Sequence, residues 1–215
     1  MYVHYLSCFT PQDDAETPLL RALGTWKSKS GSAPLQSVAT DPEDLASQLD
    51  ALALSSLDVL LIGGHGHDSR SGFWVNEMPL RWHDLAFRLR GKLPKSCSFI
   101  FYSCNGGYPG IAHVFGRESG PDFVFGRSIS VYADAMTYAV MHILAWKDAG
   151  HCDAIQARVL VDSINAWATK QYPLENDHHQ FLRVTWCEGS RSRYPDQPGG
   201  EAPSENRIRL RGWGL

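Results

Sequence analysis

The chain has 215 residues, of which 43% are hydrophobic and 20% charged, and its formal net charge is -3 at pH 7. These values are ordinary for a soluble globular protein, and the length is enough for one domain with a sizeable core. We therefore expect a single domain over residues 1–215. The small negative charge excludes a basic surface of the kind that holds a nucleic-acid backbone or an anionic membrane. No nucleic-acid or membrane partner is expected.

The cysteines and the first residues bear on the compartment. The chain has five cysteines, an odd number, and they are widely spaced with no CxxC pair. This pattern argues against a disulfide framework and favours a reducing compartment. The first residues, MYVHYLSCF, lack a basic segment followed by a long apolar run, so we expect no signal peptide. We predict a cytoplasmic protein.

Short apolar runs alternate with helical periods along the first part of the chain. We expect strands at 2–9, 35–39 and 57–64, and helices at 15–26 and 42–54. The strand at 57–64, LDVLLIGG, is a continuous apolar run that ends in glycines, which is typical of a strand buried on both faces. The second helix is predicted to begin after Asp41, with Pro42 in its first turn.

The same alternation continues in the second part of the chain. We expect a hairpin at 72–82, helices at 82–93, 134–148 and 152–170, strands at 97–103, 121–126, 181–188 and 207–213, and a mobile Gly/Pro/Ser-rich loop at 189–205. Strands that alternate with helices predict right-handed crossovers and a mostly parallel sheet. The predicted fold is therefore α/β, a three-layer sandwich in which helices flank a central sheet.

Two polar segments directly follow predicted buried strands. GGHGH follows the strand at 57–64, and SCNGG follows the strand at 97–103. In such sheets, chemistry gathers just beyond the carboxyl ends of the strands. Cys104, followed by glycines, is placed like a nucleophile, although an inert buried cysteine is the alternative. If the two strands are neighbours, His65 can accept the thiol proton and later protonate a leaving amine.

A metal site is a competing interpretation of the histidine segment. HGHD resembles part of the HxHxDH zinc motif of metallo-β-lactamase-like hydrolases, but Ser69 and Arg70 stand where that motif has Asp and His. The remaining histidines show no HExxH or paired ligand spacing. We therefore predict no metal and no cofactor, and expect His67 to be a loop residue.

A cysteine-nucleophile α/β hydrolase is a second alternative. Its nucleophile elbow has the pattern GxCxGG, and YSCNGG matches the right half. However, Tyr102 stands where the strained elbow needs a small residue. That fold also places its Asp and His after the nucleophile in the chain, which would leave His65 without a role.

The order of the two residues, histidine before cysteine and each at the end of an apolar strand, resembles the caspase-like superfamily of cysteine peptidases. This superfamily includes caspases, metacaspases, separase and the bacterial CHAT proteins. LLIGGHG and FIFYSCNGG carry the resemblance, and the segment that begins with DFVFGRS is similar to the strand, loop and long helix of CHAT proteins. The resemblance covers roughly residues 55–170.

The resemblance implies a cysteine endopeptidase that cleaves protein or peptide substrates through a thioester acyl-enzyme. Cys104 would be the nucleophile and His65 the general base, and no third residue is implied. The backbone amides of Gly66 and Cys104 would form the oxyanion hole, which contributes roughly 2.7–4 kcal/mol per donor. The resemblance also implies a regulated effector of a defence or cell-death pathway, with a regulatory protein partner. The alternative of another class is a catalytically silent caspase-like module that binds partners.

The residues that would select a substrate depart from those of the relatives. Metacaspases carry Asp, and caspases Gln, two positions before the cysteine, where this chain has Tyr102. Neither a basic nor an acidic P1 preference can therefore be transferred from these relatives, and Tyr102 is one candidate for substrate contact. Asp134 is a candidate for binding a basic P1 side chain, with the N-cap of the following helix as its alternative role. Arg127 is a candidate for binding an acidic P1 side chain.

Overall fold

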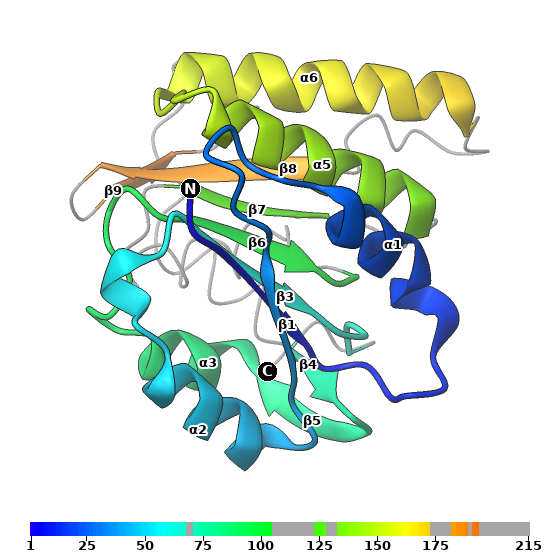
Figure 1. The fold of residues 1–215 in the computed structure, drawn as a ribbon, viewed down its shortest axis with the longest axis vertical. Coiled ribbons are helices and arrows are strands. Elements are labelled where there is room, and N and C mark those ends of the chain that lie inside the picture. The colour runs from blue at the N-terminus through cyan, green and yellow to red at the C-terminus, as the bar shows by residue number, and fades with distance from the viewer. Residues whose placement is uncertain (68–70, 105–122, 128–132, 173–181, 189–190, 194–215) are drawn as a thin grey trace.

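The computed structural model describes residues 1–67, 71–104, 123–127, 133–172, 182–188 and 191–193. A seven-stranded sheet runs through the centre of this part of the chain, in the order β2-β1-β3-β6-β7-β8-β9 (Figure 1). Its strands are β1 (Val3–Ser7), β2 (Leu35–Val38), β3 (Val59–Gly63), β6 (Ser98–Tyr102), β7 (Phe123–Arg127), β8 (Leu182–Glu188) and β9 (Arg191–Arg193). Neighbouring strands from β2 to β7 pair in parallel, and β8 pairs antiparallel with both β7 and β9. The predicted, mostly parallel sheet is confirmed.

Helices cover both faces of the sheet, as expected (Figure 1). They are η1 (Asp14–Glu16), α1 (Thr17–Thr25), α2 (Pro42–Ala51), η2 (Leu54–Ser56), α3 (Trp82–Arg88), α5 (Ala133–Asp148) and α6 (Ala154–Gln171), and a separate hairpin consists of β4 (Gly72–Val75) and β5 (Met78–Arg81). Among the described residues, no helix is both long and apolar enough to span a bilayer.

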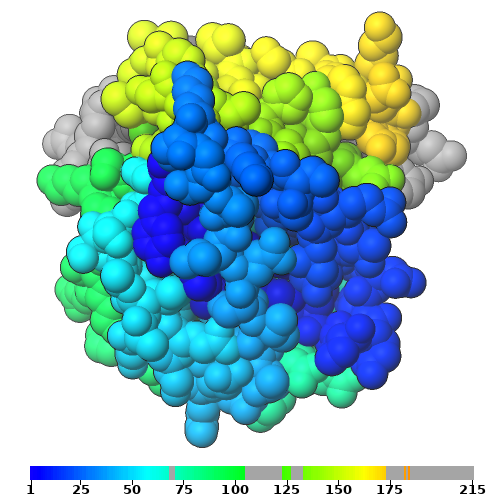
Figure 2. Space-filling model, viewed as in Figure 1, coloured from blue at the N-terminus to red at the C-terminus, as the bar shows by residue number. Residues whose placement is uncertain are grey.

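The alternation of side chains along the strands divides the core into two layers. Tyr5 and Leu61 belong to the layer that contains buried residues of α1, α5 and α6. Leu6 and Leu60, their neighbours in sequence, belong to the layer that contains buried residues of α2 and α3. Because both faces are covered, β1, β3 and β6 are buried along their whole length, which explains why their sequences are mostly apolar. In the space-filling view the blue N-terminal segments lie between the green and yellow α5–α6 layer and the cyan α2 (Figure 2).

Local signals account for the ends of several elements. Asp41 precedes α2, and its Oδ1 accepts hydrogen bonds from the amides of Glu43 and Asp44, both at 2.8 Å. This is the N-cap that the sequence predicts, since it satisfies amides that lack partners within the helix. The turn of the β4–β5 hairpin lies at Asn76 and Glu77, both with positive φ, within the hairpin expected at 72–82.

The C-terminal part differs from the expectation in one place. Residues 191–193, within the loop expected at 189–205, form β9, which pairs with β8. The expectation of a loop is wrong there, because this short segment completes an antiparallel ladder. The rest of that predicted loop, and the strand predicted at 207–213, lie outside the described residues.

Candidate active site

The ends of β3 and β6 bring the predicted dyad to the same edge of the sheet. β3 and β6 are parallel neighbours, and Gly63 is the register partner of Tyr102. His65 and Cys104 each follow these partners by two residues. The condition set by the sequence, that the two strands be adjacent, is therefore met. Histidine and cysteine leave neighbouring strands at the same level.

The loop after β3 touches the cysteine directly. A β-carbon at Gly66 would lie 2.1 Å from the carbonyl oxygen of Cys104 and 3.0 Å from its Cβ. Side chains do not approach backbone atoms this closely, so only glycine allows the contact. Cys104 is partly buried and His65 is exposed. The histidine loop and the cysteine thus share one small region at the carboxyl end of the sheet.

The hairpin β4–β5 sets the direction of the Gly66 amide. Gly66 forms an isolated antiparallel bridge with Phe73, flanked by hydrogen bonds from the Trp74 amide to the His65 carbonyl (2.8 Å) and from the His67 amide to the Gly72 carbonyl (2.9 Å). In such a pair, the opposed residues direct their own amides and carbonyls away from each other. The Gly66 N–H therefore points away from β4.

The loop after β1 supplies two contacts to His65 that the sequence did not predict. The carboxylate Oδ2 of Asp13 accepts a hydrogen bond from His65 Nε2. Phe9 packs edge-on against the imidazole, with ring centroids 5.1 Å apart. The chain passes from β1 to β2 on one side and returns to β3 on the other side of β1. Asp13 and His65 thus meet across the topological switch point, where parallel sheets place their sites.

Tyr102 faces the core and does not line a substrate groove. Its side chain is 2% exposed, and its hydroxyl lies 3.0 Å from the carbonyl oxygen of Ala15, 3.1 Å from that of Ala133 and 3.2 Å from the Thr137 hydroxyl. The expectation that Tyr102 contacts the substrate does not fit this placement. Tyr102 instead connects η1 and the start of α5 to the cysteine strand.

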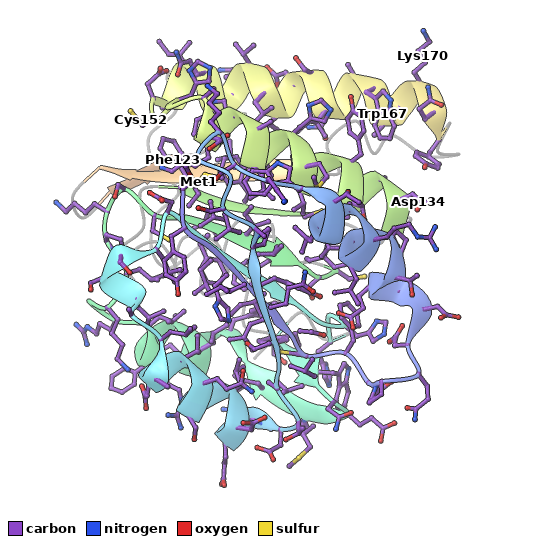
Figure 3. All side chains as sticks on the ribbon, in the orientation of Figure 1. Met1, Phe123, Asp134, Cys152, Trp167 and Lys170 are labelled. Carbon is purple, nitrogen blue, oxygen red and sulfur yellow. The ribbon has the colours of Figure 1, made fainter. Side chains whose placement is uncertain are left out.

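The two other substrate candidates lie at the same edge of the sheet. Asp134 is exposed and lies in the first turn of α5, at the end of that helix opposite Cys152 (Figure 3). It follows the first residue of the helix, so the alternative role as N-cap is not what the structure shows. Arg127 ends β7, and the register of Phe101 with Gly126 places its backbone level with Tyr102. The Arg127 side chain lies outside what the structure describes.

Cys8, Cys97, Cys152 and His67 differ from the candidate pair in their surroundings. Cys8 and Cys97 are buried, and burial raises the pKa of the Cys97 thiol to about 12 and that of Cys8 still further, so both are thiols rather than nucleophilic thiolates. Cys152 is exposed. His67 stacks on Trp74 with ring centroids 5.0 Å apart. Within the described part of the chain, no group of three or more His, Cys, Asp or Glu side chains could hold a metal ion.

Comparisons with known proteins bear on the fold. No protein-family model and no curated protein matches the sequence. Solved structures of cysteine proteases from Bacteroides thetaiotaomicron do match its fold. One is a secreted C11 cysteine protease in complex with an irreversible peptide inhibitor, with a TM-score of 0.53 and 11% sequence identity. Another, a secreted C11 cysteine protease named iotapain, has a TM-score of 0.54 and 12% identity. Each match covers 86% of this chain and 66% of the other.

The chain has the caspase-like fold. The expectation drawn from GGHG and YSCNGG is thereby confirmed for the architecture, and the α/β hydrolase alternative is not supported. At this identity the likeness concerns the fold alone, and the chain spans about two thirds of the length of the two proteases. No local signal in the sequence pointed to Asp13, whose contact with His65 joins residues 52 positions apart.

Proposed function

We propose that this protein is a cysteine endopeptidase in which Cys104 is the nucleophile and His65 the general base. The observation that carries the proposal is the register of β3 and β6, which places the two residues at equal distances beyond neighbouring strand ends. Nucleophilic catalysis needs a base within reach of the thiol, at a place that substrate can approach. The caspase-like fold, shared with solved cysteine proteases, supports the same chemistry.

Acylation begins when His65 accepts the proton of the Cys104 thiol. The thiolate attacks the carbonyl carbon of the scissile peptide bond, and the carbonyl oxygen becomes an oxyanion. The amides of Gly66 and Cys104 stabilise this charge, and each donor of this kind contributes roughly 2.7–4 kcal/mol. Protonated His65 then donates its proton to the leaving nitrogen as the C–N bond breaks. A thioester on Cys104 and a free amine result.

Deacylation uses the same groups with water as the nucleophile. His65 accepts a proton from water, which attacks the thioester carbonyl, and the same amides stabilise the second oxyanion. The C–S bond breaks, the thiolate of Cys104 takes the proton back through His65, and a free carboxylic acid leaves. The acid and base roles of His65 alternate, as required when one residue serves both half-reactions.

A carboxylate near the site favours a basic residue at P1. Asp134 belongs to the first turn of α5, and Tyr102 at the end of the cysteine strand contacts the carbonyl oxygen of Ala133, the first residue of that helix. Opposite charges across a binding site raise affinity and the rate of association. We assign the contact with P1 to Asp134, whose side chain is exposed. We expect the wild type to cleave after Arg or Lys. Asp134→Asn should lose this cleavage, while the reactivity of its Cys104 thiol stays unchanged.

The test of the proposed activity is a fluorogenic peptide library with mixed P1 residues. Wild type is compared with Cys104→Ala and His65→Ala. The matched control is Cys152→Ala, because Cys152 is an exposed cysteine at the opposite end of α5 from Asp134 (Figure 3). We expect cleavage by the wild type and the control, and none by the other two variants.

Other outcomes of the library assay separate the alternatives. Cleavage that persists in Cys104→Ala contradicts the proposal. Absence of cleavage by the wild type, together with Cys104 labelling by thiol reagents that is no faster than that of Cys152, favours the silent module that binds partners. A cytoplasmic location, a regulatory protein partner and a role as a defence effector stay predictions from the sequence and the family resemblance.

A further inference from the structure

We propose that Asp13 is a positioning residue for His65 and makes the site a triad rather than a dyad. The proposal rests on the proposed function and concerns the tautomer of the imidazole. A base that accepts the thiol proton must carry its lone pair on the nitrogen nearer the thiol, and a carboxylate that accepts a hydrogen bond from the other nitrogen ensures this. Asp13 is placed to act as that carboxylate.

The chemistry of the Asp13–His65 contact determines which atom donates the hydrogen bond. An ionised carboxylate only accepts hydrogen bonds. His65 Nε2, which faces Asp13 Oδ2, therefore carries the ring proton, and Nδ1 carries the lone pair. The Asp13 side chain is 18% exposed and that of His65 is 52% exposed, so the pair is partly shielded while the imidazole stays accessible to substrate.

The orientation of the Asp13 carboxylate is determined by a second hydrogen bond. Its other oxygen, Oδ1, accepts from the amide of Ala15 at 2.8 Å and caps η1. The Asp13 amide in turn donates to the carbonyl oxygen of Thr10 at 3.0 Å. The cap accounts for the position of Oδ1. It does not require Oδ2 to face His65, because the cap of η1 uses Oδ1 alone.

The segment that carries Asp13 is hydrogen-bonded both to β1 and to β6, the strand that leads to Cys104. Glu16 accepts hydrogen bonds from the hydroxyls of Tyr5 and Ser7 on β1, both at 2.6 Å. Ala15 accepts from the Tyr102 hydroxyl at the end of β6. The positions of Asp13 and Cys104 are therefore coupled through the fold, and this rigidity is what a positioning group needs.

Asp13→Asn separates positioning from folding. The Ala15 amide needs an acceptor, so the side-chain oxygen of the introduced asparagine keeps the cap, and Asn and Asp cap helices equally well. The side-chain nitrogen of the asparagine then faces His65 and donates a hydrogen bond to Nε2. The ring proton moves to Nδ1, and the lone pair is removed from the nitrogen that serves Cys104. Asp14→Asn is the matched control, because it makes the same charge change at the neighbouring exposed residue.

Three measurements test the proposal on the full chain. Nitrogen-15 NMR of the imidazole, assigned by comparison with His65→Ala, reports the tautomer. Iodoacetamide labelling of Cys104, measured relative to Cys152 in the same molecule by mass spectrometry, reports thiol activation without any substrate. Peptide cleavage reports kcat and KM, and thermal unfolding confirms that each variant folds.

We expect the wild type and Asp14→Asn to hold the proton on Nε2, and Asp13→Asn to hold it on Nδ1. We also expect Asp13→Asn to lower kcat roughly 100-fold or more with little change in KM, and to slow Cys104 labelling as His65→Ala does. An unchanged tautomer, or labelling and cleavage equal to those of Asp14→Asn, overturns the proposal. If His65→Ala itself leaves Cys104 labelling and cleavage unchanged, the proposed function fails instead, and the tautomer still reports on the Asp13 contact.

Discussion

The backbones of Gly66 and Cys104 meet so closely that a β-carbon on Gly66 would stand 2.1 Å from the Cys104 carbonyl oxygen. The contact joins the loop after β3 to the end of β6 and leaves no room for any side chain. Because the Gly66 amide is also the proposed oxyanion donor, this position combines a steric requirement with a catalytic one.

Gly66→Ala should therefore damage the site more than the fold. The methyl group must push the Cys104 backbone away, and displacements of about 1 Å in an active site cost on the order of 100-fold in rate. We expect kcat/KM to fall by about that factor or more. Gly24→Ala is the control, since a β-carbon there meets nothing within 4 Å and alanine is favoured in the helix α1 by roughly 0.5–1 kcal/mol. Equal activity in the two variants would show that the Gly66 contact is not needed.

Tyr102→Phe should weaken the connection between η1, α5 and β6 while it keeps the packing of the ring. The hydroxyl has partners at Ala15, Ala133 and Thr137, and loss of a buried hydrogen bond costs about 1–2 kcal/mol. Urea unfolding should show this loss, and kcat should fall because Asp13 is held by the same segment. Thr137→Val provides a comparison that removes a hydroxyl from the same cluster but leaves the bond to Ala15. A fully active Tyr102→Phe variant would contradict the coupling.

Glu77→Gly should stabilise the protein. Val75 pairs with Met78 across a two-residue turn, and Glu77 has φ of 72°, a conformation that costs a residue with a side chain about 1–2 kcal/mol. Because glycine loses more entropy on folding, the net gain in the free energy of unfolding should be about 0.5–1 kcal/mol. Asn76→Gly should not stabilise the protein, since Asn tolerates the left-handed region and the Asn76 side chain donates a hydrogen bond to the Thr40 carbonyl at 2.9 Å. A larger gain in the free energy of unfolding from Asn76→Gly than from Glu77→Gly would show that the turn is not strained at Glu77.

His4 should make the stability depend on pH. Its side chain is 6% exposed, with Nε2 hydrogen-bonded to the Ser37 hydroxyl, and burial lowers its pKa below the ordinary value of about 6.5. The unfolded chain therefore binds this proton more readily than the folded protein does, so the free energy of unfolding falls as the pH falls below about 6.5.

The comparison for His4 is His4→Gln, measured by urea unfolding between about pH 7.5 and pH 5. The stability of the wild type should decline relative to that of the variant towards the acid end. Burial also lowers the pKa of His142, but that effect is present in both proteins and cancels in the difference. Parallel curves would show that protonation of His4 does not oppose folding.

The sequence predicted the fold, and the adjacency of the strands that precede His65 and Cys104, because the signals are local. Continuous apolar runs marked β3 and β6, and His65 and Cys104 follow them directly. Asp13 has no such signal, since it lies in a loop and its role depends on a partner in another segment. Tyr102 was misleading for another reason. Its position relative to Cys104 suggested substrate contact by family resemblance, whereas alternation with Ile100, which belongs to the same core layer, indicated the interior.

The parallel arrangement of β1, β3 and β6 also has a consequence for how the protein folds. Asp13 and His65 are 52 residues apart, and each pairing of these strands joins segments that are distant in sequence. Such non-local topologies fold slowly, because a long loop must close before any contact is gained. An early intermediate with only local structure cannot bring Asp13, His65 and Cys104 together. The recovery of Cys104 reactivity during refolding would therefore report when the sheet is complete, and a newly made chain would lack this reactivity until then.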